Sequence, residues 1–237
     1  GLALGRGMDV DIIEPDVNTL SIQGPKAEDL LASVFGGNIR DIGFFKYGWI
    51  EFKGTRQLIA RSGYSRQGGF EIYLQGGHLG PALWDTIWEA GLPFNISPGC
   101  PNLIERIEGG LFSYGNEMTR ENNPFEIGHG KFCVVDGSID YIGRAALQKI
   151  AAEGVNREIR GITFGGDPCP TCSKPWPVFA AERQVGQITS GIWSPRLKKN
   201  IGQSMIDRDF WDPGQAVTVV LPNGNMRRGN VVALPIR

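Results

Sequence analysis

The sequence predicts an α+β fold, in which a region of antiparallel sheet and helices precedes a small C-terminal β-barrel-like domain. Glycine supplies 34 of the 237 residues. This is about twice its usual ~7% share, which favours turn-rich antiparallel sheet over a helical bundle. Helix-like and strand-like patterns mix up to about residue 150, and short strand-like runs dominate after it. We therefore predict two domains, residues 1–155 and 156–237, with the boundary near 150–158.

In the first domain, alternating apolar residues indicate strands, and apolar residues three or four positions apart indicate helices. The expected strands are 10–14, 18–23, 44–52, 57–62 and 70–74. The expected helices are 26–35, 79–91 and 101–112, of which the first stops at Gly36-Gly37. We expect Trp84 and Trp88 to pack in the core, because their spacing is helical.

The second domain consists of short strands with turn signals between them. The expected strands are 160–163, 177–180, 187–189, 203–206, 216–221 and 230–234. Asp212-Pro-Gly indicates one turn, and Asn223-Gly224 is a strong hairpin signal. Such a succession of strands is typical of a small barrel or sandwich.

The charge balance excludes several classes of partner. Lysine and arginine number 24 against 25 acidic residues, so the chain has no basic footprint for nucleic acid or an anionic membrane. No stretch approaches the ~20 apolar residues of a membrane helix, and the first residues lack the pattern of a signal peptide. We therefore expect a cytoplasmic protein that acts on small molecules, without nucleic-acid or membrane partners.

Cysteine and histidine give little support to metal or nucleophilic chemistry. Cys169 and Cys172 have the C-x-x-C spacing of a redox pair or half a zinc site. No second pair completes a zinc site, and the motif lies in a proline-rich loop, so we expect a structural role. His78 and His129 are the only histidines, and neither has a triad-like context. We predict no metal site and no activated serine or cysteine nucleophile.

The most informative segment is a glycine turn that leads into a strand. Gly68-Gly69 permits backbone angles that residues with a Cβ avoid. After the turn, Glu71 and Tyr73 face one side of the strand, and the apolar residues between them face the other. A carboxylate beside a phenol suits a flat heterocycle with several N–H donors, because an ionised carboxylate accepts with both oxygens. The alternative is that Glu71 and Tyr73 simply point into solvent, as polar strand residues usually do. The alternating pattern alone favours this alternative.

Five motifs follow one another along the chain. They are Leu20-Ser-Ile-Gln-Gly-Pro-Lys-Ala27, Arg61-Ser-Gly-Tyr-Ser-Arg-Gln-Gly-Gly-Phe-Glu-Ile72, Arg106-Ile-Glu-Gly-Gly-Leu-Phe-Ser-Tyr-Gly-Asn-Glu117, Tyr141-Ile-Gly-Arg-Ala-Ala-Leu147 and Gly186-Gln-Ile-Thr-Ser-Gly-Ile-Trp-Ser-Pro195. In order and spacing they resemble the tetrahydrofolate-dependent family of the glycine cleavage system T-protein. Each motif is weak alone, but together they identify the chain as a member of this family.

The resemblance implies a folate-binding α+β domain, a C-terminal barrel domain and the use of tetrahydrofolate. The glutamate that grips the pterin ring in this family corresponds to Glu71. Tyr73 is its neighbour on geometry, and we expect Tyr64, Asn102 and Trp193 to contribute to the same folate site.

Two departures from the family pattern matter. Asn102 occupies the position of an arginine that helps hold folate in aminomethyltransferases, so no charge-assisted contact is available there. Together with residues 114–126, this resembles the dimethylsulfoniopropionate demethylase branch more than glycine cleavage. Family members also carry a long segment ahead of the first residue of this chain. We therefore expect the chain to lack the family's N-terminal part, which supplies one side of the folate pocket.

The resemblance to this branch implies a methyltransferase that moves a methyl group from a sulfonium donor, such as dimethylsulfoniopropionate, to tetrahydrofolate. Such a donor needs alignment and dehydration rather than a protein nucleophile, and a sulfonium favours aromatic walls. The aromatic candidates are Trp193, Tyr114, Tyr73 and Trp49. An aminomethyltransferase, an aryl-ether O-demethylase and a non-catalytic folate-binding module remain open, as does a homodimer.

For the charged residues elsewhere in these segments, a structural role is an alternative to a catalytic or ligand-binding role. Arg106 and Glu108 share one short helix, and we expect them to position that helix and its hydrogen bonds. Residues 196–199 form a basic run, which either contacts the acidic tail of folate or lies in solvent.

Overall fold

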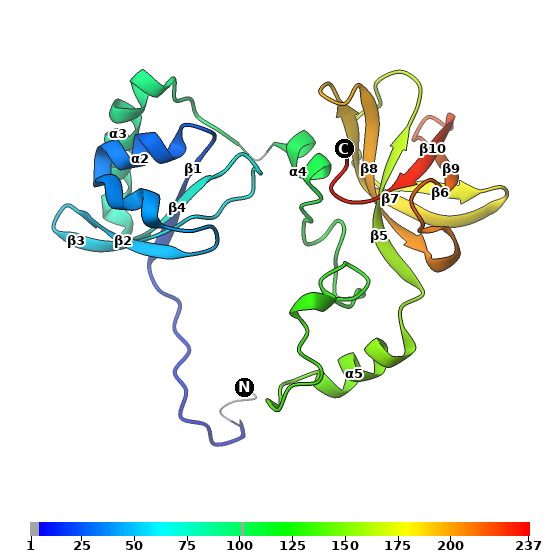
Figure 1. Ribbon diagram of the computed structural model, residues 1–237, viewed down its shortest axis with the longest axis horizontal. Helices are drawn as coiled ribbons and strands as arrows, with labels where there is room; N and C mark the ends of the chain where they lie inside the picture. The colour runs from blue at the N-terminus through cyan, green and yellow to red at the C-terminus, as the bar shows by residue number, and fades with distance from the viewer. Residues whose placement is uncertain (1–4, 101) are drawn as a thin grey trace. The chain divides into compact units, whose positions relative to one another are not determined.

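The computed structural model describes residues 5–100 and 102–237. Two compact units make up the chain, Gly1–Cys100 and Pro101–Arg237 (Figure 1). The predicted domain boundary near residue 155 is a different division of the chain, and it stays a prediction.

A four-stranded antiparallel sheet forms the centre of the first unit, with strand order β1-β4-β3-β2 (Figure 1). Its strands are β1 (Val17–Gln23), β2 (Tyr47–Phe52), β3 (Thr55–Ala60) and β4 (Gly69–Gln75). The expected strand at 10–14 is wrong, because residues 8–16 have no regular structure. The strand expected from residue 44 begins only at Tyr47, because Phe45 adopts a φ of 56° that an extended chain cannot continue through.

Two helices, α2 (Ala27–Phe35) and α3 (Gly80–Gly91), cover one face of this sheet. Short 3₁₀ turns adjoin them at Gly37–Asp41, Gly77–Leu79 and Leu92–Phe94. Leu31 of α2 and Leu83 of α3 pack against Ile59 and Ile72 of the sheet in one buried cluster. Because side chains alternate along a strand, the residues between these apolar positions lie on the opposite face. That opposite face carries Glu71 and is not covered by α2 or α3.

The expected core position of Trp84 is wrong. Trp84 is 47% exposed and stacks on Trp88, with 6.1 Å between the ring centroids. Leu83 and Ile87 form the buried side of α3. Each tryptophan follows one of these two residues by a single position, and about 100° of helical rotation moves its ring to the edge of the buried stripe.

The second unit contains α4 (Leu103–Gly109), α5 (Arg144–Glu153) and a closed antiparallel barrel (Figure 1). A 3₁₀ turn lies at Gly130–Phe132 and another at Arg208–Phe210. The barrel order is β10-β5-β8-β7-β6-β9. Its strands are β5 (Arg157–Phe164), β6 (Trp176–Ala180), β7 (Arg183–Ser194), β8 (Lys199–Asp207), β9 (Ala216–Val220) and β10 (Met226–Val232). The expected α+β class and the C-terminal barrel are therefore confirmed.

Differences from the expected elements in this unit have local causes. Helix α4 is shorter than 101–112, because Gly110 adopts a φ of +66° and ends it. Helix α5 was not expected, since its alanine-rich sequence has a weak amphipathic pattern and none of its residues is buried. Among the residues that the structure describes, no helix has the length and apolar character needed to span a bilayer.

Candidate functional site

Glu71 lies on the sheet face of the first unit that α2 and α3 do not cover. Phe70, Ile72 and Leu74, which alternate with it along β4, are buried in the core. Ser62 Oγ donates a hydrogen bond of 2.5 Å to Glu71 Oε2, and Tyr73 OH donates one of 3.3 Å to the same oxygen. Glu71 Oε1 has no hydrogen-bond partner among the described residues. The carboxylate is therefore held through one oxygen, and the other can accept from a ligand.

Gln23 fixes the turn that precedes Glu71. Its Nε2 donates to the carbonyl oxygens of Ser62 and Phe70 at 3.1 and 3.2 Å, and Ser65 Oγ donates to its Oε1 at 2.8 Å. A Cβ on Gly63 would lie 2.1 Å from Gln23 Oε1, so only glycine leaves room for this amide. Gln23 of the first motif therefore packs directly against Gly63 of the second, and together they hold the turn before Glu71.

Gly69 is required by close packing between strands. Its φ is +144°, and a Cβ there would lie 2.3 Å from the backbone oxygen of Ile22. The equivalent atom on Gly68 would meet nothing within 4 Å, although its φ is +79°. The expected glycine turn is therefore present, and it lets β4 approach β1 closely enough to place Glu71 opposite Ser21.

Arg61, the first residue of the Glu71 motif, has a structural role. Its Nη2 lies 2.6 Å from Glu28 Oε2 on α2, and its Nη1 donates to the carbonyl oxygen of Ile42 at 3.2 Å. The guanidinium also lies over the ring of Phe70. These contacts connect the covering helix to the sheet, so they support the scaffold beneath Glu71.

Of the predicted folate-site residues, the first unit contains Glu71, Tyr73 and Tyr64. Tyr64 lies in the turn itself and is 40% exposed. Asn102 and Trp193 belong to the second unit, and their place in a folate site stays a prediction. Asn102 Oδ1 caps α4 by accepting from the backbone N–H of Ile104 at 3.0 Å and of Glu105 at 3.3 Å.

Ser62 is the site residue that sequence reasoning missed. It occupies the variable position of the Arg-x-Gly-Tyr motif, so no pattern distinguished it. Its contact with Glu71 arises because the chain leaves β3 and returns through the glycine turn to β4.

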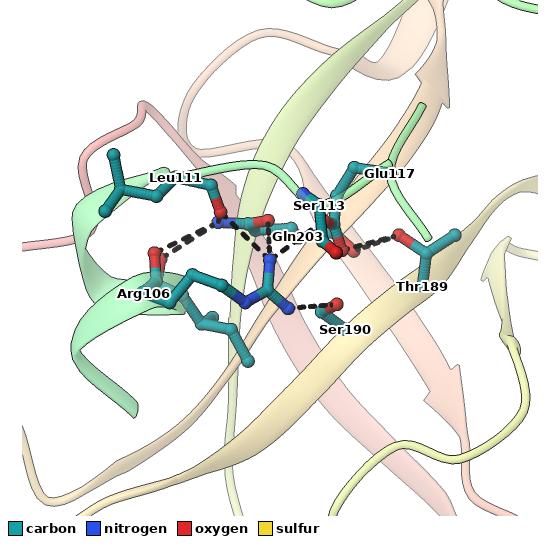
Figure 2. Close-up of polar contacts among 8 residues, drawn as sticks. Arg106, Leu111, Ser113, Glu117, Thr189, Ser190 and Gln203 are labelled. Atoms are coloured by element: carbon teal, nitrogen blue, oxygen red, sulfur yellow. Dashed lines mark hydrogen bonds and ion pairs between the residues drawn. The ribbon is translucent and has the colours of Figure 1, made fainter. Parts of the chain in front are cut away.

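The third motif forms a buried ion pair in the second unit (Figure 2). Arg106 Nη1 lies 2.8 Å from Glu117 Oε2, and their residue exposures are 5% and 3%. Arg106 also donates to the carbonyl oxygen of Leu111 at 2.9 Å and to Ser190 Oγ at 2.6 Å. Glu117 Oε2 accepts the backbone N–H of Ser113 at 2.7 Å. The pair therefore fixes the loop after α4 and attaches it to β7.

Two further residues surround this pair (Figure 2). Thr189 Oγ1 donates to Glu117 Oε1 at 3.3 Å. Gln203 Nε2 donates to the backbone oxygens of Ile107 and Leu111, both at 3.3 Å. Buried polar groups need such partners, because an unpaired one costs about 1–3 kcal/mol. The third and fifth motifs thus meet in one polar network.

Glu108 connects α4 to the end of β7. Ser194 Oγ donates to its Oε1 at 2.5 Å, and Arg196 contacts its Oε2 through Nε at 2.7 Å and Nη2 at 2.6 Å. The expectation that Arg106 and Glu108 position their helix is confirmed by these contacts. Arg196 is paired with Glu108, so its charge is already compensated, and the folate-tail contact suggested for the basic run 196–199 stays a prediction.

Comparison with known proteins identifies the family. Residues 3–137 match the GCVT N-terminal domain, and residues 157–236 match the glycine cleavage T-protein C-terminal barrel domain. The chain belongs to the glycine cleavage T-protein family. The predicted family membership is therefore confirmed.

The similar proteins in this family are named either as a dimethylsulfoniopropionate demethylase or as aminomethyltransferases. The chain is 51% identical over 224 residues to the dimethylsulfoniopropionate demethylase DmdA of Ruegeria pomeroyi, covering 94% of this chain and 61% of that protein. It is 33% identical over 220 residues to an aminomethyltransferase of Caldanaerobacter subterraneus, covering 91% of this chain and 58% of that protein. The chain therefore spans about three fifths of the length of these curated relatives.

A solved structure agrees with the fold of this T-protein family member. The crystal structure of the glycine cleavage system aminomethyltransferase T from Bartonella henselae matches with a TM-score of 0.75 and 22% sequence identity. The match covers 92% of this chain and 58% of that chain. At this identity the likeness concerns the fold alone.

The C-x-x-C motif of this family member is packed into its barrel. Cys169 is buried in the apolar cluster of the barrel, and Cys172 packs against that cluster. Burial raises the pKa of each thiol to about 11, which disfavours the reactive thiolate. No group of three metal-ligating side chains occurs within residues 5–100 and 102–237. These contacts support the structural role expected for both cysteines.

The raised thiol pKa values predict a loss of stability at alkaline pH. The unfolded chain ionises these thiols near pH 9, whereas the folded chain keeps them neutral up to a pKa of about 11. The unfolded state therefore loses protons first, and stability falls as pH rises from 9 to 11. Urea unfolding between pH 8 and 11 should show a steeper loss for the wild type than for the Cys169→Ala/Cys172→Ala variant. Equal pH slopes would contradict the prediction.

Proposed function

We propose that this chain is the folate-binding part of a methyltransferase that moves a methyl group from a sulfonium donor, such as dimethylsulfoniopropionate, to tetrahydrofolate. The proposal draws on the 51% identity to a protein named for dimethylsulfoniopropionate demethylation. It draws equally on the local geometry around Glu71. A cytoplasmic location and a homodimer remain predictions.

The observation that carries the proposal is the arrangement of the Glu71 carboxylate. Oε2 accepts from Ser62 and Tyr73, which orients the group, while Oε1 has no partner among the described residues. A reduced pterin has several N–H donors along one edge, and an ionised carboxylate recognises such an edge through charge-assisted hydrogen bonds. Holding the carboxylate in place before the ligand arrives lowers the entropic cost of binding.

The proposed transfer is a displacement without net redox change. A nitrogen lone pair of tetrahydrofolate forms the new N–CH₃ bond while the S–CH₃ bond breaks. The sulfur keeps the bonding pair and leaves as a neutral thioether, and the nitrogen releases its proton to water. No protein nucleophile is needed, so the contribution of the protein is alignment, which can be worth effective molarities of ~10⁵–10⁸ M.

An aminomethyltransferase is the second candidate. It is supported by the 33% identity to relatives with that name. Asn102 argues against it, because the arginine expected at this position in aminomethyltransferases is replaced by a neutral helix cap. The two candidates differ in the donor that they accept and share the folate acceptor.

The decisive experiment is methyl transfer from dimethylsulfoniopropionate carrying ¹³C in its S-methyl groups. We would assay this chain, and a chimera in which it replaces the matching 224-residue segment of the Ruegeria pomeroyi relative. The expected result is ¹³C-methyl tetrahydrofolate, detected by NMR, in step with release of the thioether. The unaltered relative is the control.

Two outcomes would reject the proposed donor. A folded chimera that binds tetrahydrofolate but transfers no methyl group, while the relative is active, would reject it directly. Turnover of an aminomethyl donor by the same chimera would favour the second candidate. Circular dichroism of the chimera establishes that it is folded.

A further inference from the structure

The sheet face that carries Glu71 continues across two neighbouring strands. Glu71 pairs with Ala60 on β3, and Ala60 pairs with Tyr47 on β2. In the adjacent row, Tyr73 pairs with Leu58, which in turn pairs with Trp49. Directly paired residues point to the same face of a sheet. Tyr47 and Trp49 therefore lie on the same face as Glu71, two strands away.

Tyr47 and Trp49 form an ordered aromatic pair. Their rings are perpendicular with centroids 6.3 Å apart, and they are 65% and 40% exposed. The guanidinium carbon of Arg56 lies 4.4 Å from the centroid of the Trp49 ring. Arg56 has no ion pair within the described residues, although Glu51 is its direct partner across the β2–β3 hairpin. Its positive charge is thus held over the Trp49 ring and remains available to an anion.

This arrangement opposes the suggested role of Trp49 as a sulfonium wall. A sulfonium would bind at the electron-rich face of the indole, where the Arg56 guanidinium already lies. A second cation there would meet like-charge repulsion. An aromatic ring with an attached carboxylate instead meets a ring surface and a compensating charge.

We propose that Tyr47, Trp49 and Arg56 form a second subsite of the Glu71 face, which takes the aminobenzoyl-glutamate half of tetrahydrofolate. The inference rests on the proposed folate function and adds residues to it. Neighbouring strands are about 4.8 Å apart, so β4 and β2 are separated by roughly 10 Å. That spacing suits a pterin at Glu71 joined through a short methylene-amino bridge to a benzene ring at Tyr47. Ala60, between them, is small enough to leave room for the bridge.

The test compares two ligands that differ only in this half. Isothermal titration calorimetry would measure tetrahydrofolate and 6-methyltetrahydropterin, which lacks the aminobenzoyl-glutamate group, against this chain and the chimera. Tyr47→Ala and Arg56→Gln should each weaken tetrahydrofolate binding about tenfold and leave the affinity for 6-methyltetrahydropterin unchanged. The Arg56→Gln effect should shrink as salt concentration rises. Trp84→Ala, which removes an exposed aromatic ring from α3, is the matched control and should change neither affinity.

The outcomes separate this inference from the proposed function. Wild-type affinity for tetrahydrofolate in both variants, with a loss in Glu71→Ala, would overturn the subsite and leave the function intact. A raised KM for the methyl donor with unchanged folate affinity would also overturn it. If neither the chain nor the chimera binds tetrahydrofolate, the proposed function and the subsite both fail. Arg56 is exposed, so Arg56→Gln keeps the test valid even if Tyr47→Ala disturbs the sheet edge.

Discussion

Replacing Glu117 with alanine should lower the free energy of unfolding by about 3–5 kcal/mol, the usual cost of leaving one buried charge without its partner. Arg106 would keep its charge at 5% exposure. The backbone N–H of Ser113 and the hydroxyl of Thr189 would lose their acceptor as well. We therefore expect the loop after α4 to detach from β7, and the chain to unfold at a much lower urea concentration.

Two comparisons test whether burial of the Arg106–Glu117 pair causes this loss. Asp207→Ala removes an exposed pair with Arg183, whose side chains are 38% and 59% exposed. Such pairs contribute about 0–1 kcal/mol. The double variant Arg106→Met/Glu117→Leu should lose less stability than the two single changes summed, because no charge remains buried. Urea unfolding followed by circular dichroism measures all variants. A Glu117→Ala loss no larger than that of Asp207→Ala would contradict the prediction.

Replacing Glu71 with alanine should reduce the affinity for tetrahydrofolate at least about 100-fold, while the unfolding midpoint stays close to that of the wild type. Each charge-assisted hydrogen bond contributes about 1.5–3 kcal/mol, and the carboxylate can make two to a pterin edge. Stability should change little, because Glu71 lies on the sheet face opposite α2 and α3, is half-buried and forms no ion pair among the described residues. Calorimetric titration with tetrahydrofolate measures the effect.

The matched control is Glu89→Ala on α3. Glu89 is exposed and lies on a helix that covers the opposite face of the sheet, so its removal should leave folate affinity unchanged. Glu71→Gln retains the shape but loses the charge and one acceptor oxygen, so it should still bind weakly. Unchanged affinity in Glu71→Ala would reject the assigned role of this residue.

The barrel strands were predictable wherever short apolar runs ended at strong turn signals such as Asn223-Gly224. Strands β5, β7 and β8 are longer than expected, and β7 differs most, because residues 187–189 were expected and the strand extends from Arg183 to Ser194. Its last residues include Ser190 and Ser194, which are not among the β-branched and aromatic residues enriched in strands. They are buried because they pair with β8 and bond to Arg106 and Glu108. These partners lie 84 and 86 residues away, so local pattern could not reveal them.

The candidate site, like the barrel, could be predicted from the sequence only in its local features. Alternation along β4 placed Glu71 and Tyr73 on one face, and the two glycines indicated the turn. The Ser62 contact, the Gln23 amide inside the turn and the position of Tyr47 and Trp49 on the same sheet face as Glu71 could not be predicted, because each depends on which strand lies beside which.

The sequence by itself determined the periodicity of each element, the face of β4 that bears the carboxylate, and the order of motifs that identifies the family. These are properties of neighbouring residues and of the backbone geometry that repeats along them. Only the tertiary structure decided which side chains meet. Gln23 reaches Ser62 across 39 residues, and Arg106 reaches Gln203 across 97. Such contacts depend on strand register and on the way the strands pair into a sheet or a closed barrel. Folding therefore brings together segments that are far apart in the sequence, and no local sequence pattern indicates that they meet.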